Sequence, residues 1–240
     1  MKDITTPDTT FVCGSRKYVV DNEVVDYFCD IYTVVSNIKL SGKTLNNLCS
    51  VYFSGGRNVA LKQQVKQSSH YYNIYPASLA VDGTSDNCER VFSHTSDADA
   101  NPSFELLFGT AMTVSKVRIF NRGGGASAFS LGTEKRLKGF EMEVFDSGSN
   151  VLFRYKDTKD VQMVYDLDVK LLRGATKINI KQKEKPPGET QPKISICELE
   201  VYGDCDNGFW DLDCKRCSGL CSRACHKETG QCQGRPIDKA

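Results

Sequence analysis

The chain has 240 residues, of which 40% are hydrophobic and 25% are charged, an ordinary balance for a globular protein of one or two domains that bury a core. Its 31 basic and 30 acidic residues leave a formal net charge of +1, and no apolar stretch approaches the roughly 18 residues of a membrane span. We therefore expect no nucleic-acid partner and no direct membrane insertion.

Cysteine is the most informative residue type in the composition. Eleven cysteines, an odd number clustered at one end, indicate a disulfide framework formed in an oxidising compartment with one thiol left over. The first twenty residues lack the apolar core of a secretory signal. We therefore expect the sequence to be part of a longer extracellular protein, either secreted or the ectodomain of a membrane protein.

A short sequence motif in the first segment of the chain recurs in similar form later in the chain. NLCSVYFSGG at 47–56 is similar to SICELEVYG at 195–203, with Ser50 where the second copy has Glu198. The chain therefore contains an imperfect internal repeat.

Residues 58–203 have the pattern of an all-β domain. Apolar and polar residues alternate with a period of two in short runs at 114–120, 139–145, 176–182 and 194–202. Clusters of glycine, proline, asparagine and aspartate separate these runs and are typical of turns. Because each half-apolar sheet needs another to cover it, we expect a β-sandwich of about eight strands.

The last segment, 204–240, has a different composition. Six cysteines occur in 28 residues with almost no aliphatic residues between them, so covalent links must replace a hydrophobic core. Zinc is the alternative, since CKRCSGLC and His226 offer soft ligands at short spacing. The cysteine spacing resembles part of one unit of the laminin-like and multiple-EGF family. The simplest pairing is Cys205 with Cys214, Cys217 with Cys225 and Cys221 with Cys232, and other orders stay open.

An ordered set of phrases in residues 58–203 resembles the F-type lectins, the fucolectin family that includes eel agglutinin. The phrases are RNVALKQQVKQSSHYYNIYPASLAVDG, SHTSDADANP, VSKVRIFNR, RLKGFEMEV and SICELEVYG. The resemblance implies a jelly-roll β-sandwich of the galactose-binding-like, discoidin-type superfamily that binds one structural calcium ion and one terminal L-fucose. Residues 1–57 then resemble the end of a preceding F-type domain, which suggests tandem modules and multivalent binding.

The resemblance also implies disulfides and a calcium site. The cysteine of the final C-E phrase, Cys197, pairs with Cys88, and Cys13 pairs with Cys29, which leaves Cys49 free. Calcium is a hard cation that takes six to eight oxygen ligands. The implied ligands are Asp82 and Glu198 through their carboxylates, Asn87, and the carbonyls of Leu79, Thr84 and Cys197. A solvated hairpin turn without an ion is the alternative for the segment DGTSDN.

For the sugar site, the resemblance implies His94, Arg122 and Arg136, with Lys135 as an alternative second cation. Guanidinium and imidazole groups can meet the fixed hydroxyl directions of a neutral sugar. This sequence departs from the family between the two arginines, where thirteen residues without an aspartate or a cysteine pair replace a short turn. An apolar floor for the sugar would then come from Phe129, Tyr71 or Tyr72.

Three functions follow for comparison. The first is a calcium-stabilised, fucose-type carbohydrate-binding module whose partners are fucosylated glycans or glycoproteins. The second is a degenerate module that acts as an adhesion or receptor scaffold without binding sugar. An enzyme is disfavoured, because Ser93, His94 and Asp97 are too close along one turn to imply a catalytic triad, and no hydrolase or phosphate-loop spacing occurs.

Overall fold

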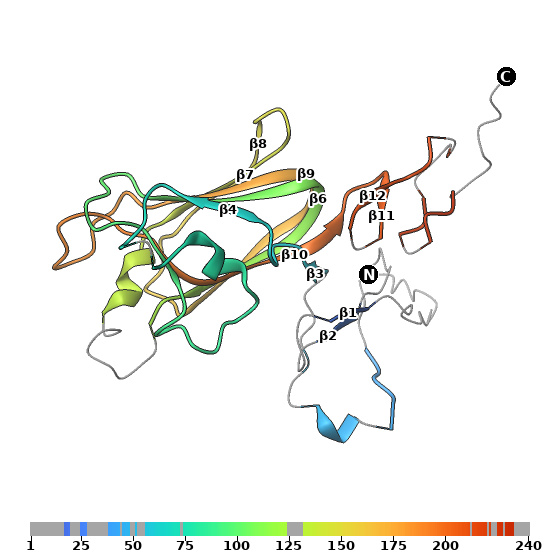
Figure 1. Cartoon of the computed structure of the whole chain (residues 1–240), viewed down its shortest axis with the longest axis horizontal. Coiled ribbons are helices and arrows are strands. Elements are labelled where there is room, and N and C mark those ends of the chain that lie inside the picture. The colour runs from blue at the N-terminus through green and yellow to red at the C-terminus, as the bar shows by residue number, and fades with distance from the viewer. Residues whose placement is uncertain are drawn as a thin grey trace, which may run out of the picture. The chain divides into compact units, whose positions relative to one another are not determined.

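The computed structural model of the chain (Figure 1) contains two compact units, Met1–Phe53 and Ser54–Ala240, which are described separately. The residues whose structure is described are 17–19, 25–27, 38–43, 45–48, 51, 56–72, 74–123, 132–211, 213–219, 221, 225–227 and 229–232. Only the backbone is described for 17–19, 25–27, 170 and 171. Within these ranges no helix is long and apolar enough to cross a membrane.

The described part of the first unit contains one small antiparallel pair of strands. β1 (Lys17–Val19) pairs with β2 (Val25–Tyr27), and the 3-10 helix η1 (Leu45–Asn47) follows. The predicted disulfide between Cys13 and Cys29 and the predicted free thiol of Cys49 lie outside the described residues. That this segment is the remnant of a preceding domain stays a prediction.

The second unit is built on an eight-stranded antiparallel network in the order β3-β10-β6-β9-β7-β8, with β4 on β6 and β5 on β10. Its strands are β3 (Arg57–Asn58), β4 (Gln64–Gln67), β5 (Ser93–His94), β6 (Ser103–Asn121), β7 (Glu141–Phe145), β8 (Val151–Lys156), β9 (Val164–Lys181) and β10 (Ser195–Cys205). Two 3-10 helices, η2 (Ala77–Val81) and η3 (Thr133–Leu137), lie in the connections, and no α-helix occurs in the described residues.

The two longest strands, β6 and β9, belong to both layers of the sandwich, and Figure 1 shows them as long neighbouring arrows. The part of β6 at 103–107 pairs with β4 and with 177–181 of β9, whereas the part at 112–121 pairs with β10 and the beginning of β9. Register shifts separate the two parts, and such irregularities bend strands from one layer to the other. The predicted all-β jelly-roll sandwich is therefore confirmed.

The core lies between the two layers and follows the alternation of the sequence. Along β6 the buried apolar residues are Phe104, Leu106, Phe108, Met112, Val114, Val117 and Ile119, with more exposed residues between them. The other strands contribute buried residues in the same way, namely Phe140, Met142, Val144, Ile178, Ile180, Leu199 and Val201. Burying one such side chain is worth about 1.5–3 kcal/mol, so this core supplies the main stabilisation of the unit.

Gly203, the glycine of the phrase SICELEVYG, lies where neighbouring backbone segments approach so closely that no side chain fits. A Cβ on Gly203 would lie 2.0 Å from the carbonyl oxygen of Thr113, and one on Gly56 would lie 2.5 Å from the Gly203 nitrogen. The register of β10 on β6 shifts at this point. Only glycine therefore allows β3, β10 and β6 to come together here.

Three disulfides and one small hairpin organise the described part of the C-terminal segment. Strands β11 (Phe209–Trp210) and β12 (Lys215–Arg216) pair with each other. The disulfides join Cys205 to Cys214, Cys217 to Cys225 and Cys221 to Cys232, the same pairs as the simplest assignment from the sequence. All six cysteines of this segment are bonded in pairs, so the structure favours disulfides over zinc.

The C-terminal segment is also attached to the end of β10 by a buried ammonium group. Lys227 is 7% exposed, and its Nζ donates to the carbonyl oxygens of Cys205, Asp206 and Phe209 at 2.5, 2.8 and 3.1 Å. Three acceptors match the three donors of an ammonium group, which removes much of the cost of burying its charge. Lys227 therefore ties the hairpin to the sandwich.

Candidate functional site

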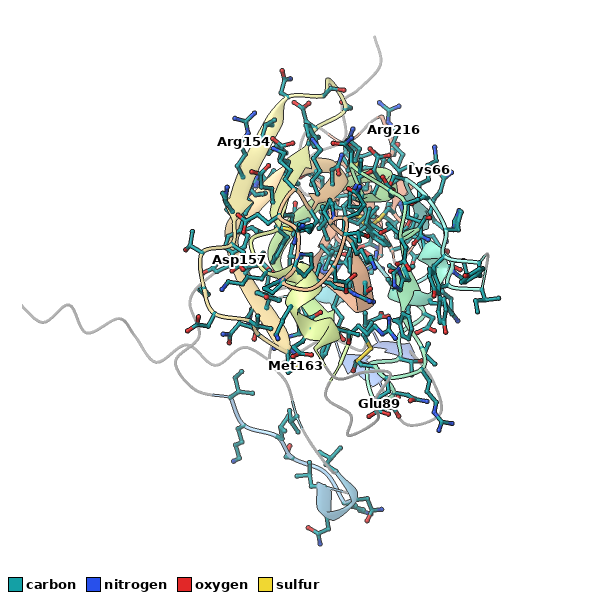
Figure 2. The ribbon with its side chains drawn as sticks, turned by 90° about the vertical axis from the view of Figure 1, so that its left-hand side faces the viewer. Lys66, Glu89, Arg154, Asp157, Met163 and Arg216 are labelled. Carbon is teal, nitrogen blue, oxygen red and sulfur yellow. A yellow bond between two sulfur atoms is a disulfide. The ribbon has the colours of Figure 1, made fainter. Side chains whose placement is uncertain are left out.

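The three side chains that were predicted to bind sugar lie together at one end of the sandwich. His94 is on β5 and pairs with Ser195 at the start of β10, Arg122 follows the end of β6, and Arg136 lies in η3. Nη1 of Arg136 is 2.9 Å from Nε2 of His94 and 3.4 Å from the Ser195 hydroxyl. Figure 2 looks onto the end of the sandwich that carries η3.

His94 is held in one neutral form. It is 2% exposed, its Nδ1 contacts the carbonyl oxygen of Thr95, and its Nε2 faces the Arg136 guanidinium. A carbonyl can only accept and a guanidinium can only donate, so Nδ1 carries the hydrogen and Nε2 is the acceptor. Burial, and then the charge of Arg136, lower the pKa of His94 to about 4. The histidine is therefore not the solvated loop residue that a lone histidine usually is.

Aromatic rings form one wall of the site. The His94 ring stacks on Tyr71, with centroids 4.7 Å apart and planes at 19°, and Tyr75 stacks on Phe92 at 4.4 Å. The Arg122 guanidinium lies over Phe92, 3.8 Å from the ring centroid. Burial, and then the charge of Arg136, lower the pKa of Arg122 to about 10, so it remains a cation at neutral pH.

Sequence reasoning missed two charged residues of this site, Glu189 and Lys193. Oε1 of Glu189 accepts from Nε of Arg136 at 2.8 Å, and its Oε2 contacts Nζ of Lys193. Lys193 also pairs with Asp97 at 2.7 Å. Glu189 and Lys193 lie in the connection before β10, within a segment that reads only as a proline- and glycine-containing turn. Nothing in that pattern marks them as partners of Arg136, which is 53 residues away along the chain.

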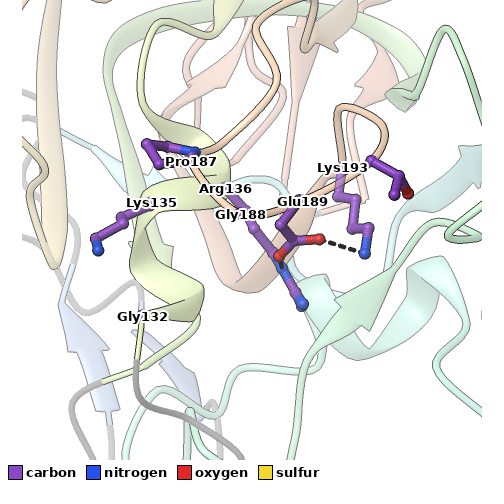
Figure 3. A pocket seen from close by; sticks show the side chains of 8 residues that line it. Gly132, Lys135, Arg136, Pro187, Gly188, Glu189 and Lys193 are labelled. Atoms are coloured by element: carbon purple, nitrogen blue, oxygen red, sulfur yellow. Dashed lines mark hydrogen bonds and ion pairs between the residues drawn. The ribbon is translucent and has the colours of Figure 1, made fainter.

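Arg136, Glu189 and Lys193 line an open hollow of about 430 Å³, shown in Figure 3 with Glu189 between the two cations. Its lining residues are Gly132, Lys135, Arg136, Pro187, Gly188, Glu189, Thr190 and Lys193. Guanidinium and ammonium donors therefore lie beside a carboxylate acceptor, an arrangement that suits a ligand with several hydroxyl groups. The predicted floor residue Phe129 lies outside the described residues, whereas Tyr71 packs on His94 and Tyr72 is 78% exposed.

The residues considered for a catalytic triad are engaged in other ways. The Ser93 hydroxyl donates to the carbonyl of Ile196 at 3.3 Å, and both ring nitrogens of His94 are bound by Thr95 and Arg136. Asp97 pairs with Lys193. His94 therefore does not serve as the base for Ser93 in this arrangement.

The predicted calcium ligands come from two segments that the structure brings together. Leu79 lies in η2, Asp82 caps that helix, Thr84 and Asn87 follow in the turn, and Cys197 and Glu198 are adjacent on β10. A disulfide joins Cys88 to Cys197, with their Cα atoms 5.0 Å apart. The amide of Gly83 donates to Oε1 of Glu198 at 3.1 Å, which links the turn to the strand.

The Glu198 carboxyl lies in an environment that suits a cation ligand. The residue is fully buried, and its Oε2 makes no hydrogen bond to the described residues. Burial, and then the charge of Asp82, raise the pKa of Glu198 to about 9. A buried carboxyl beside a second carboxylate is costly to ionise unless a cation or a donor compensates it. The residues present therefore fit a bound calcium ion.

Comparisons with known proteins agree with the sandwich fold. Neither a protein-family model nor a curated protein matches the sequence. A solved structure of a fucose binding module from Streptococcus pneumoniae, SpX-3, is 26% identical, with a TM-score of 0.50 over 60% of this chain and 96% of that chain. Another fucose binding module from the same organism is 25% identical, with a TM-score of 0.51 over 63% of this chain and 99% of that chain.

Proposed function

We propose that residues 58–203 form a non-enzymatic carbohydrate-binding module of the F-type lectin kind, which recognises terminal fucose on glycans outside the cell. The observation that carries this proposal is the convergence of His94, Arg122 and Arg136 at one end of the sandwich, with Arg136 2.9 Å from His94. The similarity of the chain to two fucose binding modules supports it. The disulfides support an extracellular location.

Each residue of the proposed site has a distinct role toward a sugar. Arg122 and Arg136 donate hydrogen bonds to ring and hydroxyl oxygens, because a guanidinium presents several donors in a fixed plane. His94 orients Arg136, because the single lone pair of its Nε2 accepts from that guanidinium. The exposed ring of Tyr72, packed edge-on against Tyr71 with centroids 4.5 Å apart, offers an apolar surface beside the site.

Calcium is the proposed structural cofactor. Asp82 and Glu198 would hold it through their carboxylates, with Asn87 and the carbonyls of Leu79, Thr84 and Cys197 completing an oxygen shell. The ion would supply the positive charge that two neighbouring carboxyl groups need in a buried setting. The orphaned Oε2 of Glu198 supports this assignment.

The segments on either side of the sandwich would belong to neighbouring modules of the same protein. Residues 1–57 would be the remnant of a preceding F-type domain, and 204–240 a partial EGF-like module. Tandem modules would then give multivalent attachment to fucosylated surfaces, because linked sites raise the effective concentration of each other.

Glycan binding by the purified chain tests the proposal. The expected result is binding to fucosylated members of a glycan panel that Arg122→Ala and His94→Ala abolish, while Arg154→Ala, whose side chain is 72% exposed on β8, leaves it unchanged. Binding to fucosylated glycans that survives Arg122→Ala would place the sugar elsewhere. Absence of any glycan binding by the folded chain would reject the lectin function.

One observation favours a second candidate, a scaffold that makes protein contacts without binding sugar. Arg136 already contacts His94, Ser195 and Glu189, so part of its donor capacity is satisfied within the protein. A folded chain that binds no glycan but adheres to a protein-coated surface would support this candidate.

A further inference from the structure

We infer that Glu189 makes the hollow selective for uncharged sugars and excludes glycans whose terminal residue carries a sulfate or a carboxylate. This inference rests on the proposed carbohydrate-binding function. It assigns a specificity-determining role to a residue of the 182–194 connection, which sequence patterns treat only as a turn.

Glu189 is held in place by one backbone contact and two contacts of its carboxylate. Its own amide donates to the carbonyl of Pro186 at 3.1 Å, Oε1 binds Nε of Arg136, and Oε2 contacts Lys193. The exposed fractions of the side chains are 18% for Glu189, 12% for Arg136 and 9% for Lys193. Figure 3 shows the carboxylate pointing between the two cations at the edge of the hollow.

Glu189 is a permanent negative charge in this setting. Burial by itself would raise the pKa of Glu189, but hydrogen bonds from Lys193 and Arg136 outweigh it and hold the pKa below its usual value. The carboxylate is therefore ionised at neutral pH, and it already engages donors of Arg136 and Lys193 that an anionic group of a ligand would use.

An anionic sugar would have to compete with Glu189 for Arg136 and Lys193, because the third cation of the hollow, Lys135, is exposed to solvent that screens its charge. Displacing the carboxylate would leave a partly buried charge without its partners, which costs more than the pair contributes. Leaving it in place would bring two negative charges together in a poorly solvated hollow. Both routes weaken the binding of sulfated or carboxylated sugars.

An uncharged sugar meets no such conflict. Nη2 of Arg136 makes no hydrogen bond to the described residues, so it can donate to a ring or hydroxyl oxygen. Each oxygen of Glu189 has a second lone pair that can accept from a hydroxyl group. The ion pair thus offers both a donor and an acceptor to a hydroxyl-bearing ligand.

The test compares the wild-type chain with Glu189→Gln and Lys193→Met, using methyl α-L-fucopyranoside and its monosulfates as probes in calorimetry. Glu189→Gln removes the internal anion, so the affinity ratio of neutral to sulfated probe should fall by about tenfold or more, a factor typical of one removed charge conflict. Lys193→Met removes one of the two positive charges that offset the negative charge of Glu189, so the affinity ratio of neutral to sulfated probe should rise. A structural defect alone would not move the ratio in opposite directions.

Glu184→Gln is the matched control, because its carboxylate is 55% exposed and pairs with Lys156 at 3.9 Å. It should retain the wild-type ratio, which excludes a general effect of net charge. Wild-type chain that binds the neutral probe, with an unchanged ratio in Glu189→Gln, would overturn this inference and leave the proposed function intact. Wild-type chain that binds none of the probes at millimolar concentration would overturn both.

Discussion

Nη1 of Arg136 lies 2.9 Å from Nε2 of His94, a contact that exists only while the imidazole is neutral. Protonation would place a second positive charge on the ring and turn Nε2 from an acceptor into a donor. The geometry of the proposed sugar site therefore depends on the protonation state of His94, and this dependence can be measured.

The first prediction is a loss of stability and of sugar binding in acid. The pKa of His94 falls from 6.5 in the unfolded chain to about 4 in the folded chain, so the unfolded state binds the proton first. The stabilisation from this group is complete above pH 6.5 and is lost as the pH falls to about 4, with a total of about 3 kcal/mol. Fucose binding should likewise fall as the pH approaches 4.

An NMR titration of the imidazole resonances checks this prediction, with His94→Gln assigning the signal. A His94 resonance that titrates near pH 6.5 would contradict the buried, neutral form. Urea unfolding at pH 7 and pH 4.5 should show a smaller difference in His94→Gln than in the wild-type chain, because the variant has no proton to bind at this position.

The second prediction concerns Glu198. It separates the free-energy cost of burying its carboxyl group from the proposed role of that group as a calcium ligand. Without calcium, the raised pKa of Glu198 makes its contribution to stability complete below pH 4.5 and progressively lost up to about pH 9, by at most about 1.4 kcal/mol per pH unit. In chelator at pH 7.5, Glu198→Gln should therefore be at least as stable as the wild-type chain.

With calcium, the wild-type chain should be more stable than Glu198→Gln. The ion would raise the melting temperature of the wild-type chain, because a ligand bound only by the folded state stabilises it, and Glu198→Gln would lack that gain. Glu105→Gln, a partly exposed carboxylate on β6, is the control that should respond to calcium like the wild type. A melting temperature of the wild-type chain that calcium and chelator leave unchanged would contradict the assignment.

The β-sandwich could be predicted from the sequence because the alternation of apolar and polar residues is a local pattern. The alternation of buried and exposed residues in β6 and β10 is visible in the letters, and 194–202 overlaps β10 closely. The expected strand at 114–120 is only one part of β6, which runs from Ser103 to Asn121. The bend near Gly109 reads as an interruption in the sequence, whereas in the structure the strand continues through it into the other layer.

The candidate site was only partly predictable, because its contacts join distant parts of the chain. Resemblance pointed to His94, Arg122 and Arg136, and the structure brings them together. Glu189 and Lys193 were missed, since a charged residue in a turn has no pattern until its partner is known. The orphaned Oε2 of Glu198 likewise follows from burial, which a sequence does not specify for a single carboxylate.

The third prediction is that the disulfide of Cys88 and Cys197 stabilises the sandwich more than that of Cys205 and Cys214. The bonded residues are 109 positions apart in the first pair and 9 in the second. In the chain-entropy model, removing the first costs about 4–5 kcal/mol and removing the second about 2–3 kcal/mol. Urea unfolding of the two double alanine variants measures the difference, and equal losses would show that strain or residual structure dominates.

The fourth prediction concerns the attachment of the C-terminal segment through Lys227. Lys227→Met keeps the length of the side chain but leaves the carbonyls of Cys205, Asp206 and Phe209 without their shared donor. Leaving a buried carbonyl such as that of Cys205 unsatisfied costs about 1–3 kcal/mol, so the hairpin of β11 and β12 should open more often. Faster amide exchange at the Asp211 amide, which donates to the Lys227 carbonyl at 2.8 Å, should report this opening while β6 and β9 stay protected.

Lys215→Met is the matched control for this last change. Lys215 is 54% exposed and pairs with Asp211 at 2.6 Å, and an exposed ion pair of this kind contributes little to stability. Its exchange rates should stay close to those of the wild-type chain, although both variants lose one positive charge. Equal acceleration in both variants would mean that net charge governs the hairpin, whereas acceleration in Lys227→Met alone would establish the buried ammonium group as the link between the hairpin and the sandwich.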